Sequence, residues 1–212
     1  NVPRHSVVGV VGESGCGKSV TSLSLMQLLQ RPTGQTVGGE IRFNMGDGKA
    51  LNIVKTPTAK MQEIRGNRIS MIFQEPMTSL NPVFKIGRQV NEVLELHHPE
   101  MTEEQVKART LEMLELVGIA NKEGVYEMYP HELSGGMRQR VMIAIALACT
   151  PELIIADEPT TALDVTIQAQ ILDLLRQLPS KYGLTVIYIT HDLGVVANVA
   201  DRLAVTYAGH IV

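Results

Sequence analysis

The sequence feature that most constrains the fold is the segment formed by residues 7–19, VVGVVGESGCGKS. A β-branched run leads directly into a glycine-rich stretch and helix-compatible residues follow, which matches G-x-x-x-x-G-K-[ST] in the order strand, turn, helix. Glycines allow successive backbone N–H groups to turn inward around an anion, and Lys18 adds a full positive charge. The segment therefore predicts a phosphate-binding loop, with the Ser19 hydroxyl available to Mg²⁺. A glycine-rich turn that binds no ligand is the alternative.

Composition limits the classes of protein to which the chain can belong. Its 212 residues, 44% hydrophobic and 19% charged, are enough for one large α/β domain or for a core with a smaller inserted lobe. A formal net charge of −3 argues against nucleic acid as a partner. No apolar run reaches the roughly 20 residues that span a bilayer, and no signal peptide is visible. Cys16 and Cys149 do not form a disulfide framework, which fits a reducing cytosol.

Strand patterns alternate with helix patterns along most of the chain. After the first strand, apolar or alternating runs predict strands over residues 40–44, 69–73, 153–156, 184–190 and 203–207. Helices are expected over residues 20–30, 138–149, 167–178 and 193–199. This alternation predicts an α/β fold with a mainly parallel sheet, whose ligands bind at the carboxyl ends of the strands. A strand that begins near residue 211 and the start at Asn1 lead us to expect truncation at both ends.

A charged, amphipathic helical block interrupts this alternation over residues 85–119, and Thr102 begins a capping-box pattern within it. The block predicts a helical lobe over residues 76–149, inserted between two parts of a P-loop core, residues 1–75 and 150–212. Residues 121–124, Asn-Lys-Glu-Gly, resemble a guanine-binding motif but lack its final aspartate, so we interpret them as a loop.

Polar residues end three of the expected strands, and a parallel sheet brings such ends to one edge. Asp157 follows an apolar run and is suited to bind Mg²⁺, while Glu158 is suited to accept a proton from an attacking water. Gln74 is suited to orient water or contact Mg²⁺, and His191 to donate a hydrogen bond to a γ-phosphate. Two adjacent acids are often only a solvated turn, and a lone glutamine is usually a surface amide.

Ser134, Gly135 and Gly136 offer a hydroxyl and two glycine N–H groups at the start of a helix. They predict a second phosphate cradle that lacks a lysine of its own. Two half-sites in one chain indicate a nucleotide held between two subunits. An ordinary helix cap followed by glycines is the alternative.

Together these motifs resemble the ATP-binding-cassette (ABC) ATPases over essentially the whole chain. Residues 12–19 look like the Walker A loop, Gln74 like the Q-loop glutamine and residues 133–137 like the signature. Residues 153–158 look like the Walker B strand, residues 162–164 like the D-loop and His191 like the switch histidine. Residues 73–82 and 129–137 look like the branch that serves dipeptide, oligopeptide and nickel importers.

The resemblance implies an ABC ATPase with ATP and Mg²⁺ as its cofactors and Glu158, His191, Gln74 and Lys18 as catalytic residues. It implies Mg²⁺ ligation by Ser19, Gln74 and Asp157. The residues that it implies for nucleotide binding are Gly12, Glu13, Ser14, Gly15, Cys16, Gly17, Lys18, Ser19, Val20, Gln74, Ser134, Gly135, Gly136, Asp164 and His191. The adenine-stacking aromatic residue and the C-terminal extension of the branch are expected outside these 212 residues.

The resemblance also implies partners and a location. We expect a head-to-tail dimer with an identical or paralogous ATPase subunit, docked on membrane permease subunits at the cytoplasmic face of the cell membrane. An extracytoplasmic solute-binding protein is an indirect partner, and nucleic acid is not expected. Two other classes remain open, a soluble ABC-type ATPase that acts on nucleic acid or ribosomes and a P-loop phosphotransferase. The resemblance implies the ATP-hydrolysing subunit of an importer for di- or oligopeptides, although the individual solute, dipeptide, oligopeptide, nickel or other, is not specified.

Overall fold

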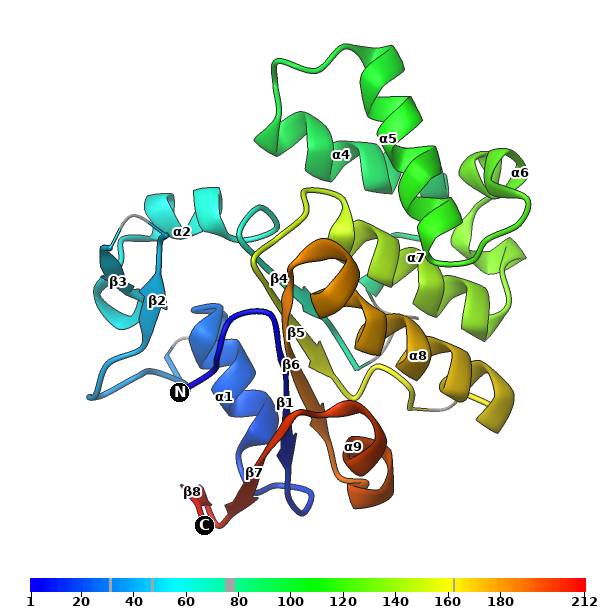
Figure 1. The fold of residues 1–212 in the computed structure, drawn as a ribbon. Helices are drawn as coiled ribbons and strands as arrows, with labels where there is room; N and C mark the ends of the chain where they lie inside the picture. The colour runs from blue at the N-terminus through cyan, green and yellow to red at the C-terminus, as the bar shows by residue number, and fades with distance from the viewer. Residues whose placement is uncertain (31, 47, 75–78, 162) are drawn as a thin grey trace.

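The computed structural model describes residues 1–30, 32–46, 48–74, 79–161 and 163–212. Its centre is a six-stranded sheet in the order β4-β5-β6-β1-β7-β8 (Figure 1). All neighbours from β4 to β7 pair in parallel, and only β8 is antiparallel, so the expected mainly parallel α/β sheet is confirmed. The strands are β1 (Val7–Val11), β4 (Ile69–Ile72), β5 (Leu153–Asp157), β6 (Thr185–Thr190), β7 (Arg202–Tyr207) and β8 (His210–Ile211).

Helices cover both faces of this sheet, with α1 (Lys18–Leu25) on one face and α8 (Val165–Tyr182) and α9 (Leu193–Val199) on the other (Figure 1). Because side chains alternate along a strand, β5 and β6 supply both cores. Ile154 and Tyr188 belong to the larger cluster, whereas Ile155 and Ile187 belong to the smaller one. Both strands are buried along their whole length, as expected for a parallel sheet covered on both sides.

Helix α1 is shorter than the pattern over residues 20–30 predicts. It ends at Leu25, because the chain turns at Gln27 into the left-handed region (φ 50°). Arg65, the residue after α2 (Thr58–Ile64), accounts for the end of α1 through its guanidinium group. Its Nε donates to the carbonyl of Met26 at 2.7 Å and its Nη2 to the carbonyl of Gln27 at 3.0 Å. These bonds satisfy the carbonyls at the end of the helix, so tertiary contacts override local propensity.

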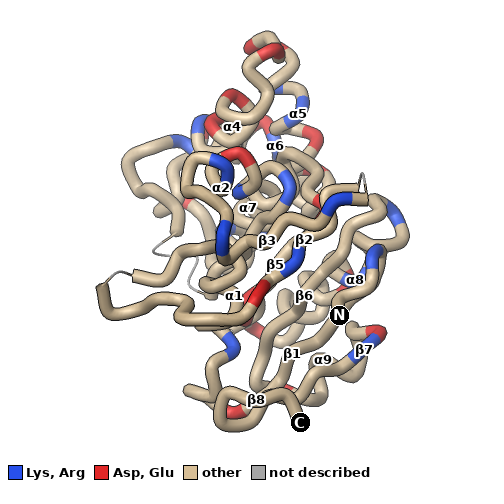
Figure 2. The backbone as a smooth tube through the Cα atoms, turned by 90° about the vertical axis from the view of Figure 1, so that its left-hand side faces the viewer, with Lys and Arg blue, Asp and Glu red and all other residues tan. Residues whose placement is uncertain are grey.

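The helices α4 (Ile86–His97), α5 (Glu103–Leu116) and α6 (Lys122–Glu127) gather at one end of the molecule, beside α7 (Gly135–Leu147) (Figures 1 and 2). The capping box at Thr102 is confirmed. Our interpretation of residues 121–124 as a loop is wrong. Asn121 Oδ1 accepts a hydrogen bond from the N–H of Gly124 at 3.1 Å, and this cap starts α6. The division of the chain into core and lobe at residues 75/76 and 149/150 stays a prediction.

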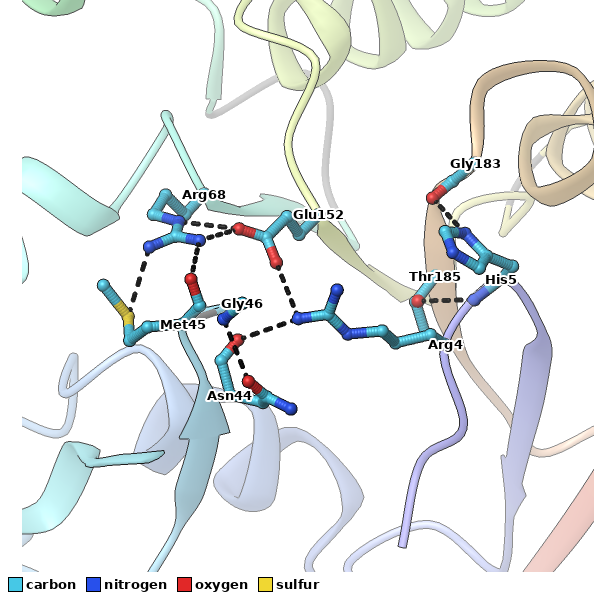
Figure 3. Close-up of polar contacts among 9 residues, drawn as sticks. All are labelled: Arg4, His5, Asn44, Met45, Gly46, Arg68, Glu152, Gly183 and Thr185. Atoms are coloured by element: carbon cyan, nitrogen blue, oxygen red, sulfur yellow. Dashed lines mark hydrogen bonds and ion pairs between the residues drawn. The ribbon is translucent and has the colours of Figure 1, made fainter. Parts of the chain in front are cut away.

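A small hairpin of β2 (Arg42–Asn44) and β3 (Ala50–Asn52) lies against the amino ends of the central strands, followed by the 3₁₀ turn η1 (Ile53–Lys55). Polar contacts hold the hairpin against these strand ends (Figure 3). Arg68 bonds both the carboxylate of Glu152, with Nε at 2.7 Å, and the carbonyl of Met45 at 2.8 Å. Arg4 lies 3.5 Å from the same carboxylate. In the described part of the chain, no helix has the length and apolar character needed to cross a membrane.

Candidate functional site

The strand order places the polar residues singled out in the sequence at one edge of the sheet. The strands β4, β5, β6 and β1 are consecutive neighbours, and each ends in one of these segments. Gln74 follows β4, Asp157 ends β5 and Glu158 follows it, His191 follows β6, and the glycine-rich loop follows β1. The structure thus brings together residues that are up to about 180 positions apart in the chain, as expected at the carboxyl edge of a parallel sheet.

The glycine-rich loop has the backbone of an anion cradle. Gly15 (φ 81°) and Gly17 (φ 100°) adopt left-handed conformations, and open space lies where their Cβ atoms would be. A Cβ on Gly12 would lie 2.2 Å from the carbonyl oxygen of Thr206, so this position accepts only glycine. Helix α1 begins at Lys18, directly after Gly17. The loop therefore presents N–H groups at a helix N-terminus, which is the arrangement that fits a phosphate group.

The Lys18 side chain is held against the glycine-rich loop by hydrogen bonds to the backbone of that loop. Only 6% of the residue is exposed, and Nζ donates to the carbonyl oxygens of Gly12 and Glu13, both at 2.8 Å. Nζ also lies 3.8 Å from the Sγ of Cys16, which is buried. The ammonium thus stands beside the cradle formed by the loop, where its charge reaches an anion held there.

Asp157 is a buried carboxylate with two hydroxyl partners. Ser19 Oγ lies 3.2 Å from Oδ1 and Ser22 Oγ lies 3.3 Å from Oδ2, while the residue is 4% exposed. Burial raises the pKa of this carboxyl above its ordinary value, although the two serine hydrogen bonds and Lys18 oppose that shift. Ser22 was missed from sequence. It lies three residues after Ser19 on the same face of α1, which was the available signal.

The pair of Ser19 and Asp157 fits Mg²⁺ by its chemistry, because both groups offer hard oxygen ligands. Within the described ranges, no three His, Cys, Asp or Glu side chains cluster as metal ligands. One carboxylate and one hydroxyl are nonetheless what Mg²⁺ takes from a protein when substrate phosphates and water complete its coordination.

The carboxylate of Glu158 is the meeting point of three side chains from three segments. His191 Nδ1 lies 3.0 Å from Oε1, and Gln74 Nε2 donates to Oε2 at 3.1 Å. Thr161 Oγ1 also donates to Oε2, at 3.1 Å. The Glu158 side chain is 14% exposed and that of His191 61%. The sequence analysis did not single out Thr161. Its signal was a hydroxyl three residues after a strand-end acid, the spacing at which a turn returns toward its start.

Ser134, Gly135 and Gly136 lie elsewhere, at the start of α7. Ser134 Oγ caps the helix by accepting from the N–H of Met137 at 3.3 Å. Asp164 caps α8 in the same way, with Oδ1 2.9 Å from the N–H of Ile167. The two helix starts share a hollow of about 510 Å³ that contains Ser134, both glycines and Asp164.

The hollow at the starts of α7 and α8 lies apart from the glycine-rich loop of the same chain, and none of residues 12–19 lines it. Among the described residues, no hydrogen bond joins Ser134, Gly135 or Gly136 to residues 12–19. Ala162 and residues 75–78, which belong to the expected D-loop and Q-loop, lie outside the described residues. The structure therefore assembles one group of site residues and leaves the other on a different part of the surface.

Comparisons with known proteins point to one family. The family model described as ABC transporter matches residues 1–161. The chain is 55% identical over 212 residues to a probable peptide ABC transporter ATP-binding protein, y4tR, of Sinorhizobium fredii. It is 56% identical over 212 residues to the oligopeptide transport ATP-binding protein OppD of Bacillus subtilis. All of this chain is covered in both matches, but it spans only 62% and 58% of the lengths of these relatives.

Solved structures agree with the fold. The chain superposes with a TM-score of 0.85 and 29% identity on the dimeric structure of MJ0796, described as a bacterial ABC transporter cassette, covering all of this chain and 85% of the other. The same score and identity hold for a dimeric post-hydrolysis state of MJ0796 bound to ADP and Pi.

Proposed function

Because the chain belongs to the ABC transporter family, we propose that it hydrolyses ATP as the ATP-binding part of an importer for di- or oligopeptides. The observation that carries the proposal is the convergence on Glu158 of Gln74 and His191, next to a phosphate-binding loop. The relatives named above as peptide and oligopeptide transport proteins support the substrate class. Neither action on nucleic acid or ribosomes nor phosphotransfer to a small molecule is favoured by these relatives.

The triphosphate is bound by the backbone of residues 12–20 and by Lys18. The loop N–H groups and the Lys18 ammonium neutralise charge on the β- and γ-phosphate oxygens. Ser19 and Asp157, with Gln74 nearby, are suited to hold Mg²⁺, which when bound neutralises charge on the same oxygens. Because Asp157 is buried and already hydrogen-bonded to Ser19, these ligands are positioned before the ion arrives.

Glu158 accepts a proton from the water that attacks the γ-phosphorus. A general base must lie within hydrogen-bonding reach of that water, and a strand end beside the loop is suited to that position. His191 and Gln74, which now contact the carboxylate, are suited to donate to the γ-phosphate and to orient the water. Their shared contact with Glu158 links nucleotide contacts to the position of the base.

The site is completed by a second subunit. Ser134, Gly135 and Gly136 supply N–H groups and a hydroxyl at a helix start, but none of the described residues that line their hollow is a lysine. Arg140, which does line it, is bonded to the carbonyl of Val117 and to Gln170. A head-to-tail pair places this group of one subunit over the ATP bound to Lys18 of the other, with Asp164 beside it. The solved structure of MJ0796, which is described as dimeric, supports the presence of a second subunit.

Membership of the transporter family supports two further partners, membrane permease subunits and a solute-binding protein. Closure and reopening of the dimer drive permease subunits at the cytoplasmic face of the membrane, and a solute-binding protein on the other side delivers the peptide. The test is purification of the protein from membranes with its associated proteins, followed by reconstitution into vesicles. ATP-dependent uptake of labelled di- or oligopeptides supports the proposal. ATP turnover with uptake of nickel but no peptide would contradict the substrate class.

A further inference from the structure

The turn that follows Glu158 contains a hydroxyl that neither the family motifs nor the proposed mechanism uses. Glu158, Pro159, Thr160 and Thr161 form a four-residue turn, closed by the N–H of Thr161, which donates to the carbonyl of Glu158 at 3.2 Å. The same residue also donates its Oγ1 to Oε2 of Glu158 at 3.1 Å. Thr161 is therefore bonded to both the backbone and the carboxylate of Glu158.

The backbone at Glu158 is itself unusual. Its φ is 46°, in the left-handed region that a glutamate rarely enters, and its N–H bonds the carbonyl of Ile189 on β6 at 2.9 Å. Strained conformations of this kind persist only when the surroundings hold them. The conformation of Glu158 is held by its hydrogen bond to Ile189 and by the hydrogen bond from Thr161 that closes the turn. The position of the carboxylate therefore depends on residues of the turn.

We propose that Thr161 is a positioning residue for Glu158, whose hydroxyl keeps the carboxylate aimed during the ATP cycle. Gln74 and His191, the other two donors to that carboxylate, are the ones assigned to nucleotide contacts. When they turn to a bound nucleotide, Thr161 is the donor that remains, because its bond lies within the turn. The inference rests on the proposed function, in which Glu158 is the base.

Its neighbour Thr160 supplies a matched control. Thr160 Oγ1 lies 3.3 Å from the hydroxyl of Tyr188 in the buried core, and not at the carboxylate. Thr160→Val and Thr161→Val thus remove the same group from adjacent positions of one turn. A merely structural role of the turn would make both variants lose thermal stability, whereas a positioning role separates their effects on turnover.

The experiment measures kcat and KM for ATP, ATP affinity and thermal unfolding for the full-length protein, four single variants and one double variant. The single variants are Thr161→Val, Thr161→Ser, Thr160→Val and Glu158→Gln, and the double variant combines Thr161→Val with Glu158→Gln. We expect Thr161→Val to lower kcat about tenfold, since a hydrogen bond to a charged group is lost, with KM changed less than about twofold. Thr161→Ser should restore turnover, and Thr160→Val should lower the unfolding temperature while leaving kcat near normal. In the Glu158→Gln background, Thr161→Val should have no further effect.

The inference is overturned if Thr161→Val turns over normally, if the serine variant is as slow as the valine variant, or if the loss persists in the Glu158→Gln background. The proposed function fails separately, and the inference with it, if Glu158→Gln alone keeps full turnover.

Discussion

Ser19 Oγ lies 3.2 Å from Asp157 Oδ1, although 138 residues separate them in the chain. The contact joins the first turn of α1 to the end of β5, and it buries a carboxylate that is 4% exposed. Among the described residues, no cation lies at hydrogen-bond distance from this carboxylate, and a buried carboxylate without such a partner costs folding stability. Such a residue is a candidate for a functional site, which agrees with the proposed binding of Mg²⁺.

This cost predicts a gain in stability when the charge at Asp157 is removed. Burial raises the pKa of Asp157 in the folded protein, so the folded state binds the proton more tightly than the unfolded state. The free energy of unfolding therefore falls as the pH rises from the pKa of the aspartate in the unfolded chain, about 4, through its higher pKa in the folded protein. We expect Asp157→Asn to unfold at a higher temperature than the parent at pH 7, with the difference shrinking toward pH 4. Thermal unfolding without nucleotide, between pH 4 and 8, measures it.

The matched control is Asp173→Asn, which neutralises an exposed carboxylate of α8 that bonds Gln177. We expect its free energy of unfolding to change by less than about 0.5 kcal/mol. An Asp157→Asn variant that is less stable than the parent at pH 7, or whose difference does not vary with pH, would show that the buried charge is compensated.

Replacing Glu158 by glutamine removes the proposed base but keeps the size and hydrogen-bonding capacity of the side chain. We expect hydrolysis to fall by about 10²-fold or more, because general-base catalysis contributes that much, while ATP binding is retained. The bound, unhydrolysed nucleotide should also trap the dimer, which gel filtration with ATP detects. Turnover within threefold of the parent would remove Glu158 from its assigned role.

The contacts that hold the β2–β3 hairpin lead us to expect that removing one of them lowers the free energy of unfolding without changing ATP binding. Glu152→Ala leaves Arg68, whose side chain is 28% exposed, without its carboxylate partner (Figure 3). We expect a loss of about 1–2 kcal/mol in the free energy of unfolding, since a partly buried charged donor then lacks its acceptor. Urea denaturation measures it, with ATP affinity expected to stay normal because Glu152 lies at the opposite end of β5 from Asp157.

The comparison variant is Glu95→Ala, which removes the partner of Arg88. Both side chains of that pair are about half exposed, at 55% and 44%, so the pair contributes little. Equal losses for Glu152→Ala and Glu95→Ala would mean that the hairpin contacts have no special weight.

The sheet, and the edge at which the candidate site residues meet, were predictable because their sequence signals are local. Runs such as the one before Asp157 are long enough and β-branched enough to identify buried strands, and parallel strands bring their ends together. The order of the strands has no such local signal, yet it decides that Gln74 and His191 both reach Glu158. Their convergence was expected from fold class rather than from any spacing in the sequence.

The features missed from sequence depend on tertiary contacts or on weak signals. Helix α1 ends at Leu25 because Arg65, far along the chain, bonds the carbonyls that follow it. The interpretation of residues 121–124 as a loop is wrong because it does not include the capping ability of Asn121, which starts α6. Thr161 and Ser22 matter only through contacts with strand-end acids, and hydroxyls in turns and helices are too common to be singled out.

The central claim is that one ATP is held by Lys18 of one subunit and by Ser134 of its partner, and mixing two inactive variants tests it most directly. Lys18→Ala and Ser134→Phe each damage both sites of a pair of identical subunits. A mixed pair instead carries one site with both changes and one intact site, which is a consequence of head-to-tail symmetry.

The measurement is ATP turnover of each variant alone and of an equal mixture after subunit exchange. We expect the separate variants to be inactive and the mixture to recover about a quarter of the parent rate, since half of the pairs are mixed and each has one intact site of two. A mixture no more active than the sum of its parts, with subunit exchange demonstrated, would contradict the shared site. So would a Ser134→Phe variant that hydrolyses ATP at the parent rate.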